Sequence, residues 1–188
     1  MHAAAVGRDD GGALVVGRGG AGKSTLALAS LACGMRYCGD DMVILERSDA
    51  WTAHTVWATA RLVDGGEHLV PHVGATRLTD GDGPDVKLVA DVYAQFGEAV
   101  ASSLPVSLVV MPEVGSARAP ERSRPGRAAL ELAASTFLYM PGGDPSATLS
   151  MIARMLEQVP VYGLGVSEDL AGAVAEVARL LREPSGGA

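Results

Sequence analysis

One short stretch of the chain combines glycines, a lysine and a hydroxyl group at a spacing that suits phosphate binding. Residues 17–25 read GRGGAGKST and match the pattern G-x-x-x-x-G-K-[ST]. Small residues let several backbone N–H groups converge on phosphate oxygens, and a helix that starts at Lys23 directs the positive end of its dipole to the same place. The expected phosphate-binding residues are Gly17, Arg18, Gly19, Gly20, Ala21, Gly22, Lys23, Ser24 and Thr25.

Lysine is rare in this chain, which makes its presence in the loop informative. Lys23 and Lys87 are the only lysines, and arginine otherwise carries the positive charge. In a loop of this kind the lysine reaches the β- and γ-phosphates, and the hydroxyl of Ser24 holds Mg²⁺. The motif therefore predicts binding of a nucleoside triphosphate together with Mg²⁺.

Two adjacent carboxylates follow the predicted helix of the loop. Asp40 and Asp41 stand just before the apolar segment 42–46, which is typical of a strand. In an α/β sheet, strand ends and helix N-termini that form a site lie along one edge. One acid can therefore sit on the metal side, and the other can take a proton from an attacking hydroxyl group.

The remaining sequence predicts elements that could position these groups. Predicted strands cover 2–6, 13–16, 42–46, 54–63, 86–93, 105–112 and 161–166, the first two forming a hairpin. Predicted helices cover 23–33, 128–135, 146–158 and 168–183, with Ser167 as the N-cap of the last. Segments 64–85 and 113–127 are predicted loops. Interleaved strands and helices indicate an α/β fold in a single domain, 1–188, in which the apolar segment 105–112 is a strand buried on both faces.

Composition excludes several classes of protein. The net charge of −7 argues against a nucleic-acid partner. No apolar segment reaches about 18 residues, so no membrane span is expected, and the first ten residues lack the pattern of a signal peptide. We therefore expect a soluble cytoplasmic protein, with Cys33 and Cys38 as buried reduced thiols.

Residues 17–45, GRGGAGKSTLALASLACGMRYCGDDMVIL, resemble the catalytic core of the HPr kinase/phosphorylase family. The order of the elements is similar: the glycine-rich P-loop (residues 17–24), a helix, a glycine and the Asp40-Asp41 pair. The distance along the chain from Lys23 to that pair is also similar. His2 opens the hairpin before the loop, as a histidine does in that family. The segments LPVSLVVMPEV and MLEQVPVYGLGVSEDL are similar to a short branch associated with peptide maturation. The resemblance implies a single P-loop domain of the HPr kinase/PEP carboxykinase-like type, with a mixed sheet and flanking helices.

The resemblance also implies roles for individual residues. Lys23 would bind the phosphates of ATP, and Ser24 would bind Mg²⁺. Asp41 would act as the general base toward a serine hydroxyl, Asp40 would support the metal or the acceptor, and His2 would line the site. The implied acceptor is a protein or peptide with a serine, either an HPr-like carrier or a biosynthetic precursor peptide, and the chain could form a homo-oligomer.

The sequence also departs from the family pattern. Thr25 stands where the bifunctional enzymes carry glutamate, and Glu67 is near the position of a further acidic metal ligand without a matching context. RPGR at 124–127 is similar to a tetrapeptide used in dephosphorylation, and we interpret it as a chance match. The N-terminal domain of full-length relatives is absent from the sequence.

Two other functions remain open at this stage. The chain could be an ATP-binding regulatory module without transferase activity. It could instead be a small-molecule kinase in which the arginine-rich segment 113–127 serves as a lid. Independently of that function, the arginines of this segment could close over the triphosphate or dock an acidic peptide, or they could simply form a solvated loop. Arg61 is a further candidate for the site.

Overall fold

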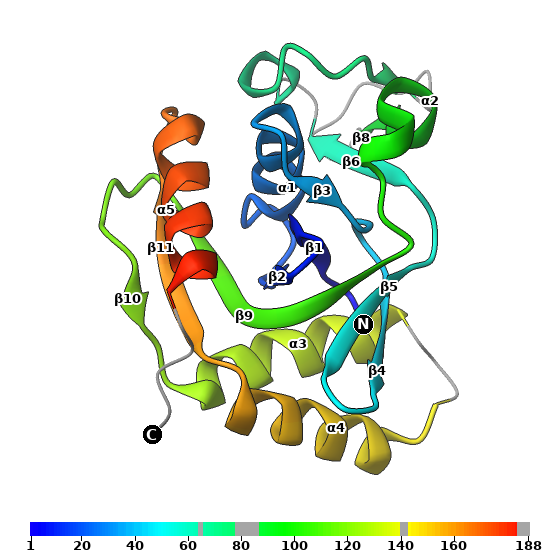
Figure 1. The fold of residues 1–188 in the computed structure, drawn as a ribbon, viewed down its shortest axis with the longest axis vertical. Helices are drawn as coiled ribbons and strands as arrows, with labels where there is room; N and C mark the ends of the chain where they lie inside the picture. The colour runs from blue at the N-terminus through cyan, green and yellow to red at the C-terminus, as the bar shows by residue number, and fades with distance from the viewer. Residues whose placement is uncertain (64–65, 78–86, 140–142, 184–188) are drawn as a thin grey trace.

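A mixed β-sheet forms the centre of the protein (Figure 1). The structure is a computed structural model that describes residues 1–63, 66–77, 87–139 and 143–183. The main path of the sheet runs β10–β11–β9–β2–β1–β3, and β5 joins it by pairing with the first residues of β9 and with β4. The strands are β1 Ala4–Arg8, β2 Gly11–Val15, β3 Arg36–Tyr37, β4 Val43–Arg47, β5 Trp51–Thr55, β9 Ser103–Val114, β10 Glu121–Arg122 and β11 Val161–Val166.

The predicted hairpin and the predicted central strand are both confirmed. β1 and β2 pair antiparallel around a two-residue turn, Asp9–Asp10, with Arg8 opposite Gly11. β9 pairs in parallel with β2 on one side and with β11 on the other. Its middle residues are buried on both faces, which explains why the sequence there is apolar without alternation.

Helices cover both faces of this sheet, so the predicted α/β class with flanking helices is confirmed. Helix α1 (Lys23–Ala32) and helix α5 (Leu170–Arg182) pack on one face, and helices α3 (Pro125–Tyr139) and α4 (Pro145–Gln158) pack on the other (Figure 1). Leu132 of α3 is fully buried in the second layer. Burial of such a side chain contributes about 1.5–3 kcal/mol to folding. None of the described helices is long and apolar enough to cross a membrane.

A smaller sheet lies beside α1 and brings residues 59–63 toward the P-loop. It has the order β6–β8–β7, with β6 Thr59–Val63, β7 Thr76–Arg77 and β8 Lys87–Asp91. β8 leads into the short helix α2 (Val92–Phe96), and the 3-10 turns η1 (Glu67–Leu69) and η2 (Gly97–Ala99) complete the described elements. The phenol of Tyr37 in β3 donates a hydrogen bond to the carbonyl of Thr59 at 2.9 Å, which ties β6 to the larger sheet.

Several predicted boundaries were wrong. The single strand predicted at 54–63 is two strands, β5 and β6, and the strand predicted at 86–93 ends at Asp91, whose carboxylate caps α2. The predicted loop 113–127 contains the end of β9, all of β10 and the first turn of α3. Parts of the predicted loop 64–85 lie outside the described residues.

Two predictions for single residues were also wrong. Asp169, not Ser167, is the N-cap of α5, because its carboxylate accepts a hydrogen bond from the backbone N–H of Gly172 at 3.1 Å. Cys33 is exposed, since it follows the last turn of α1 at the surface, whereas Cys38 is buried as predicted.

Candidate nucleotide and acid–base site

The glycine-rich loop connects β2 to α1 at the edge of the sheet. Gly20 and Gly22 have φ angles of 77° and 88°, which side chains other than glycine rarely adopt. Gly22 is the residue before the first turn of α1, so the free N–H groups of that turn open toward the loop. Lys23 is buried, and its ammonium donates hydrogen bonds to the carbonyls of Gly17 at 2.8 Å and Arg18 at 3.0 Å. The lysine therefore holds the loop closed around the position expected for phosphate.

Asp40 lies in the turn between β3 and β4, and its side chain is completely buried. Its Oδ2 accepts a hydrogen bond from the backbone N–H of Arg61 at 3.3 Å, and it is also hydrogen-bonded to the Ser24 side chain. Within the described residues, Oδ1 has no hydrogen-bond partner. Burial raises the pKa of Asp40, and the hydrogen bond from Ser24 opposes that rise.

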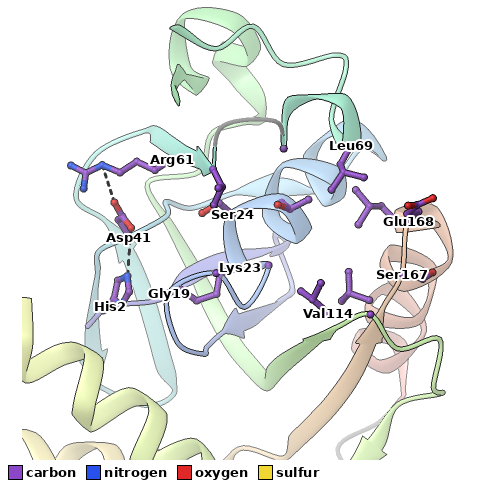
Figure 2. Close-up of a pocket in the computed structure, with 18 residues that line it drawn as sticks. His2, Gly19, Lys23, Ser24, Asp41, Arg61, Leu69, Val114, Ser167 and Glu168 are labelled. Carbon is purple, nitrogen blue, oxygen red and sulfur yellow. Dashed lines mark ion pairs between the residues drawn. The ribbon is translucent and has the colours of Figure 1, made fainter. Parts of the chain in front are cut away.

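Asp41 follows Asp40 in the same turn, and its side chain lines the cavity. Its φ angle is 63°, a left-handed conformation that aspartate tolerates better than most residues. Its Oδ1 lies 3.5 Å from Nε2 of His2, and its Oδ2 lies 3.0 Å from Nε of Arg61 (Figure 2). The side chain of Asp41 is 23% exposed. The turn thus presents one buried and one accessible carboxylate.

His2 and Arg61 come from distant parts of the chain. His2 precedes β1 and is 6% exposed, and its backbone N–H donates to Oγ1 of Thr136 in α3 at 3.3 Å. Arg61 is in β6, and its side chain is 49% exposed. Its backbone contacts Asp40 while its guanidinium contacts Asp41, so this residue touches both acids.

These groups share one cavity of about 420 Å³. Figure 2 shows His2, Asp41 and Arg61 at one end, with Ser24 and Lys23 near the middle. The opposite end is lined mainly by apolar side chains. They are Leu69, Val114, Val166 and Leu170, with Ser167 and Glu168 beside them.

The structure thus brings together most of the residues predicted for the site. Gly19, Gly20, Gly22, Lys23, Ser24, Thr25, His2 and Asp41 line the cavity, as does Arg61. Asp40 lies behind Ser24, Gly17 contacts Lys23 from the loop, and Ala21 bonds through its N–H to Arg18. The side chain of Arg18 points outward and forms an ion pair with Glu131 at 3.7 Å.

Other predicted candidates lie elsewhere. Glu67 is exposed and does not line the cavity, and no group of three or more His, Cys, Asp or Glu side chains in the described ranges could hold a metal ion. The arginines of the segment 113–127 line a separate cavity of about 230 Å³. Arg127, in the RPGR tetrapeptide, forms an ion pair with Glu113 at 2.7 Å.

The apolar end of the cavity was not predicted from the sequence. Its residues come from η1, the end of β9, and the connection from β11 to α5. No motif marks them, because each is an ordinary apolar or polar residue at the end of an element. Val114 and Val166 are brought together by the parallel pairing of β9 and β11, and a prediction of that register is the signal that could have indicated it.

Comparisons with known proteins find solved structures that resemble this chain. The Hpr(Ser) kinase/phosphatase from Coxiella burnetii matches with a TM-score of 0.49 and 16% sequence identity, over 95% of this chain and 92% of that chain. No family model matches the sequence, and no curated protein does. A similarity of this size does not define a family or an activity.

Proposed function

We propose that this protein is a kinase that transfers the γ-phosphoryl group of ATP to a serine hydroxyl of a protein or peptide. The observation that carries the proposal is the position of Asp41. This carboxylate lies at the accessible end of the cavity that also contains the P-loop lysine, and the buried Asp40 is adjacent to it in the chain. The resemblance of residues 17–45 to HPr kinases supports the same activity.

The P-loop accounts for phosphate binding. The N–H groups of the loop and of the first turn of α1 neutralise part of the triphosphate charge, and the ammonium of Lys23 adds a full positive charge. These donors are fixed before the nucleotide arrives, since Lys23 already bonds to the loop carbonyls. A preorganised cation of this kind stabilises charge that develops on the transferred group.

Ser24 and Asp40 fit a Mg²⁺ site. Asp40 offers a buried carboxylate oxygen that lacks a partner in the described part of the chain, and its hydrogen bond to Ser24 places a hydroxyl oxygen nearby. Mg²⁺ in such proteins takes one or two protein oxygens and completes its shell with phosphate oxygens and water. When bound, it would neutralise charge on the β- and γ-phosphates.

Asp41 would take the proton of the attacking serine hydroxyl. The two neighbouring groups, His2 and Arg61, hold its carboxylate from opposite sides at 3.5 and 3.0 Å. Holding the base in place favours a reactive geometry once the hydroxyl enters. Arg61 also brings a positive charge to the end of the cavity where the γ-phosphate would lie.

The test uses ATP labelled at its γ-phosphate, Mg²⁺ and a lysate of the organism that encodes the protein. Wild-type protein is expected to label a discrete protein or peptide. Asp41→Asn should abolish labelling while ATP still binds, and Asp49→Asn, a change at an exposed aspartate in the turn between β4 and β5, should leave labelling intact. Labelling that persists at the wild-type rate in Asp41→Asn would refute the assignment of the base. ATP binding without Asp41-dependent labelling would indicate a regulatory module instead.

A further inference from the structure

The cavity is chemically different at its two ends, which gives a bound nucleotide a direction. Charged side chains line the end that contains Asp41, and apolar side chains dominate the end that contains Val114 (Figure 2). The P-loop lies between them. A nucleotide has the same asymmetry, since a charged triphosphate is joined to a flat and largely apolar base.

Val114 forms the floor of the apolar end. It is the last residue of β9 and is 64% exposed, although valines in this strand are otherwise mostly buried. It pairs in register with Val166 of β11, and the N–H of Gly115 donates to the carbonyl of Val166 at 2.9 Å, which fixes the two strand ends together. A Cβ atom built on Gly22 would lie 3.1 Å from Cγ2 of Val114. The apolar surface therefore begins directly beside the P-loop.

Two polar groups stand at the rim of this surface. Oγ of Ser167 accepts a hydrogen bond from the backbone N–H of Asp169 at 3.2 Å, so its own proton remains available for donation. The carboxylate of Glu168 is exposed, and no described residue donates a hydrogen bond to it or pairs with it. A donor and an acceptor side by side match the Watson–Crick edge of a purine, which presents both kinds of group.

We propose that the apolar end is the purine-base subsite of the nucleotide. The ring would lie against Val114 and Leu69, and its polar edge would face Ser167 and Glu168. The triphosphate would then run across the P-loop with its γ-phosphate toward Asp41. This inference rests on the proposed ATP-dependent function and deepens it by assigning the residues that recognise the base.

The experiment separates base binding from phosphate binding. Isothermal titration calorimetry with Mg²⁺ would compare ATP with inorganic tripolyphosphate, which has the phosphates alone. Val114→Ser and Glu168→Ala are expected to weaken ATP binding by about tenfold each and to change tripolyphosphate binding by less than about twofold. Val56→Ser and Glu157→Ala, exposed residues outside the cavity, are the matched controls and should change neither.

Each outcome decides the inference. Equal losses for ATP and tripolyphosphate, or no loss in either variant, would overturn the base subsite while leaving ATP binding in place. Wild-type protein that binds both ligands with the same affinity would also overturn it, because the base would then contribute nothing. Wild-type protein that binds neither ligand would refute the proposed nucleotide-dependent function itself, and the subsite with it.

Discussion

Replacement of Asp40 by asparagine should make the unliganded protein more stable. The carboxylate is fully buried, and one of its oxygens has no partner among the described residues. Its other contacts are a hydrogen bond with the Ser24 side chain and the backbone N–H of Arg61 at a long 3.3 Å. A buried charge that hydrogen bonds compensate only in part costs several kcal/mol, whereas a neutral amide leaves at most one polar group unpaired at a cost of about 1–3 kcal/mol. We therefore expect Asp40→Asn to raise the free energy of unfolding by about 1–2 kcal/mol, which for a protein of this size raises Tm by about 2–8 °C.

The pH dependence of this effect has a definite sign. Because burial raises the pKa of Asp40 in the folded protein, its charged form destabilises the fold at any pH above the pKa of the unfolded chain. Well below about pH 4 the carboxyl group is neutral in both states, and the part of the difference between wild type and Asp40→Asn that comes from the charge should vanish. Thermal unfolding followed by circular dichroism from about pH 3 to about pH 8 would measure this pH dependence, with Asp49→Asn as an exposed control.

The same substitution should remove the response to metal. Mg²⁺ with ATP is expected to raise the Tm of the wild-type protein above the value with ATP and EDTA, because ligands that bind the folded state stabilise it. In Asp40→Asn the two values should coincide. An unliganded variant with a Tm equal to or below that of wild type at pH 7 would refute the reasoning about the buried charge, and a full Mg²⁺ response in the variant would refute the metal site.

Three further substitutions test other parts of the structure. Arg61→Ala frees one side of Asp41 and should lower the rate of phosphoryl transfer, measured with labelled ATP, by about tenfold or more. Arg36→Ala, which removes a surface ion pair, is the control and should leave the rate unchanged. An unchanged rate in Arg61→Ala would contradict the role of Arg61. Gly22→Ala forces a left-handed φ on alanine beside the P-loop and should abolish ATP binding in calorimetry; retained affinity would show that the loop tolerates the strain. Leu132→Ala opens a cavity between α3 and the sheet and should cost about 2–5 kcal/mol in urea unfolding, and a loss below about 1 kcal/mol would indicate that the layer collapses to fill it.

The local parts of the site could be predicted from the sequence because their geometry depends on neighbouring residues. Glycines at fixed positions determine the backbone of the loop, and the alternation of strand, loop and helix determines where Lys23 points. The same holds for the Asp-Asp turn, where a glycine and two short polar residues end one strand and begin the next. The α/β class also followed from local patterns, since helical and extended periodicities interleave along the chain.

The sequence was less informative about boundaries. The strand predicted at 54–63 is divided because its first residues belong to β5, which pairs with β4, whereas its last residues form β6, which pairs with β8 in the smaller sheet. Ser167 and Asp169 are both good capping residues, and which of them caps α5 depends on how the end of β11 approaches the helix.

What the sequence by itself determined was therefore the local groups of the candidate site, a glycine-rich loop with Lys23 and Ser24 and the two acids that follow it. The tertiary structure decided that Asp40 is buried and Asp41 accessible, that His2 and Arg61 hold Asp41, and that Val114 meets the P-loop from β9. These contacts join segments as far apart as residues 2 and 61. They depend on sheet register and helix packing, which sum many small interactions across the whole core, so no short segment encodes them alone.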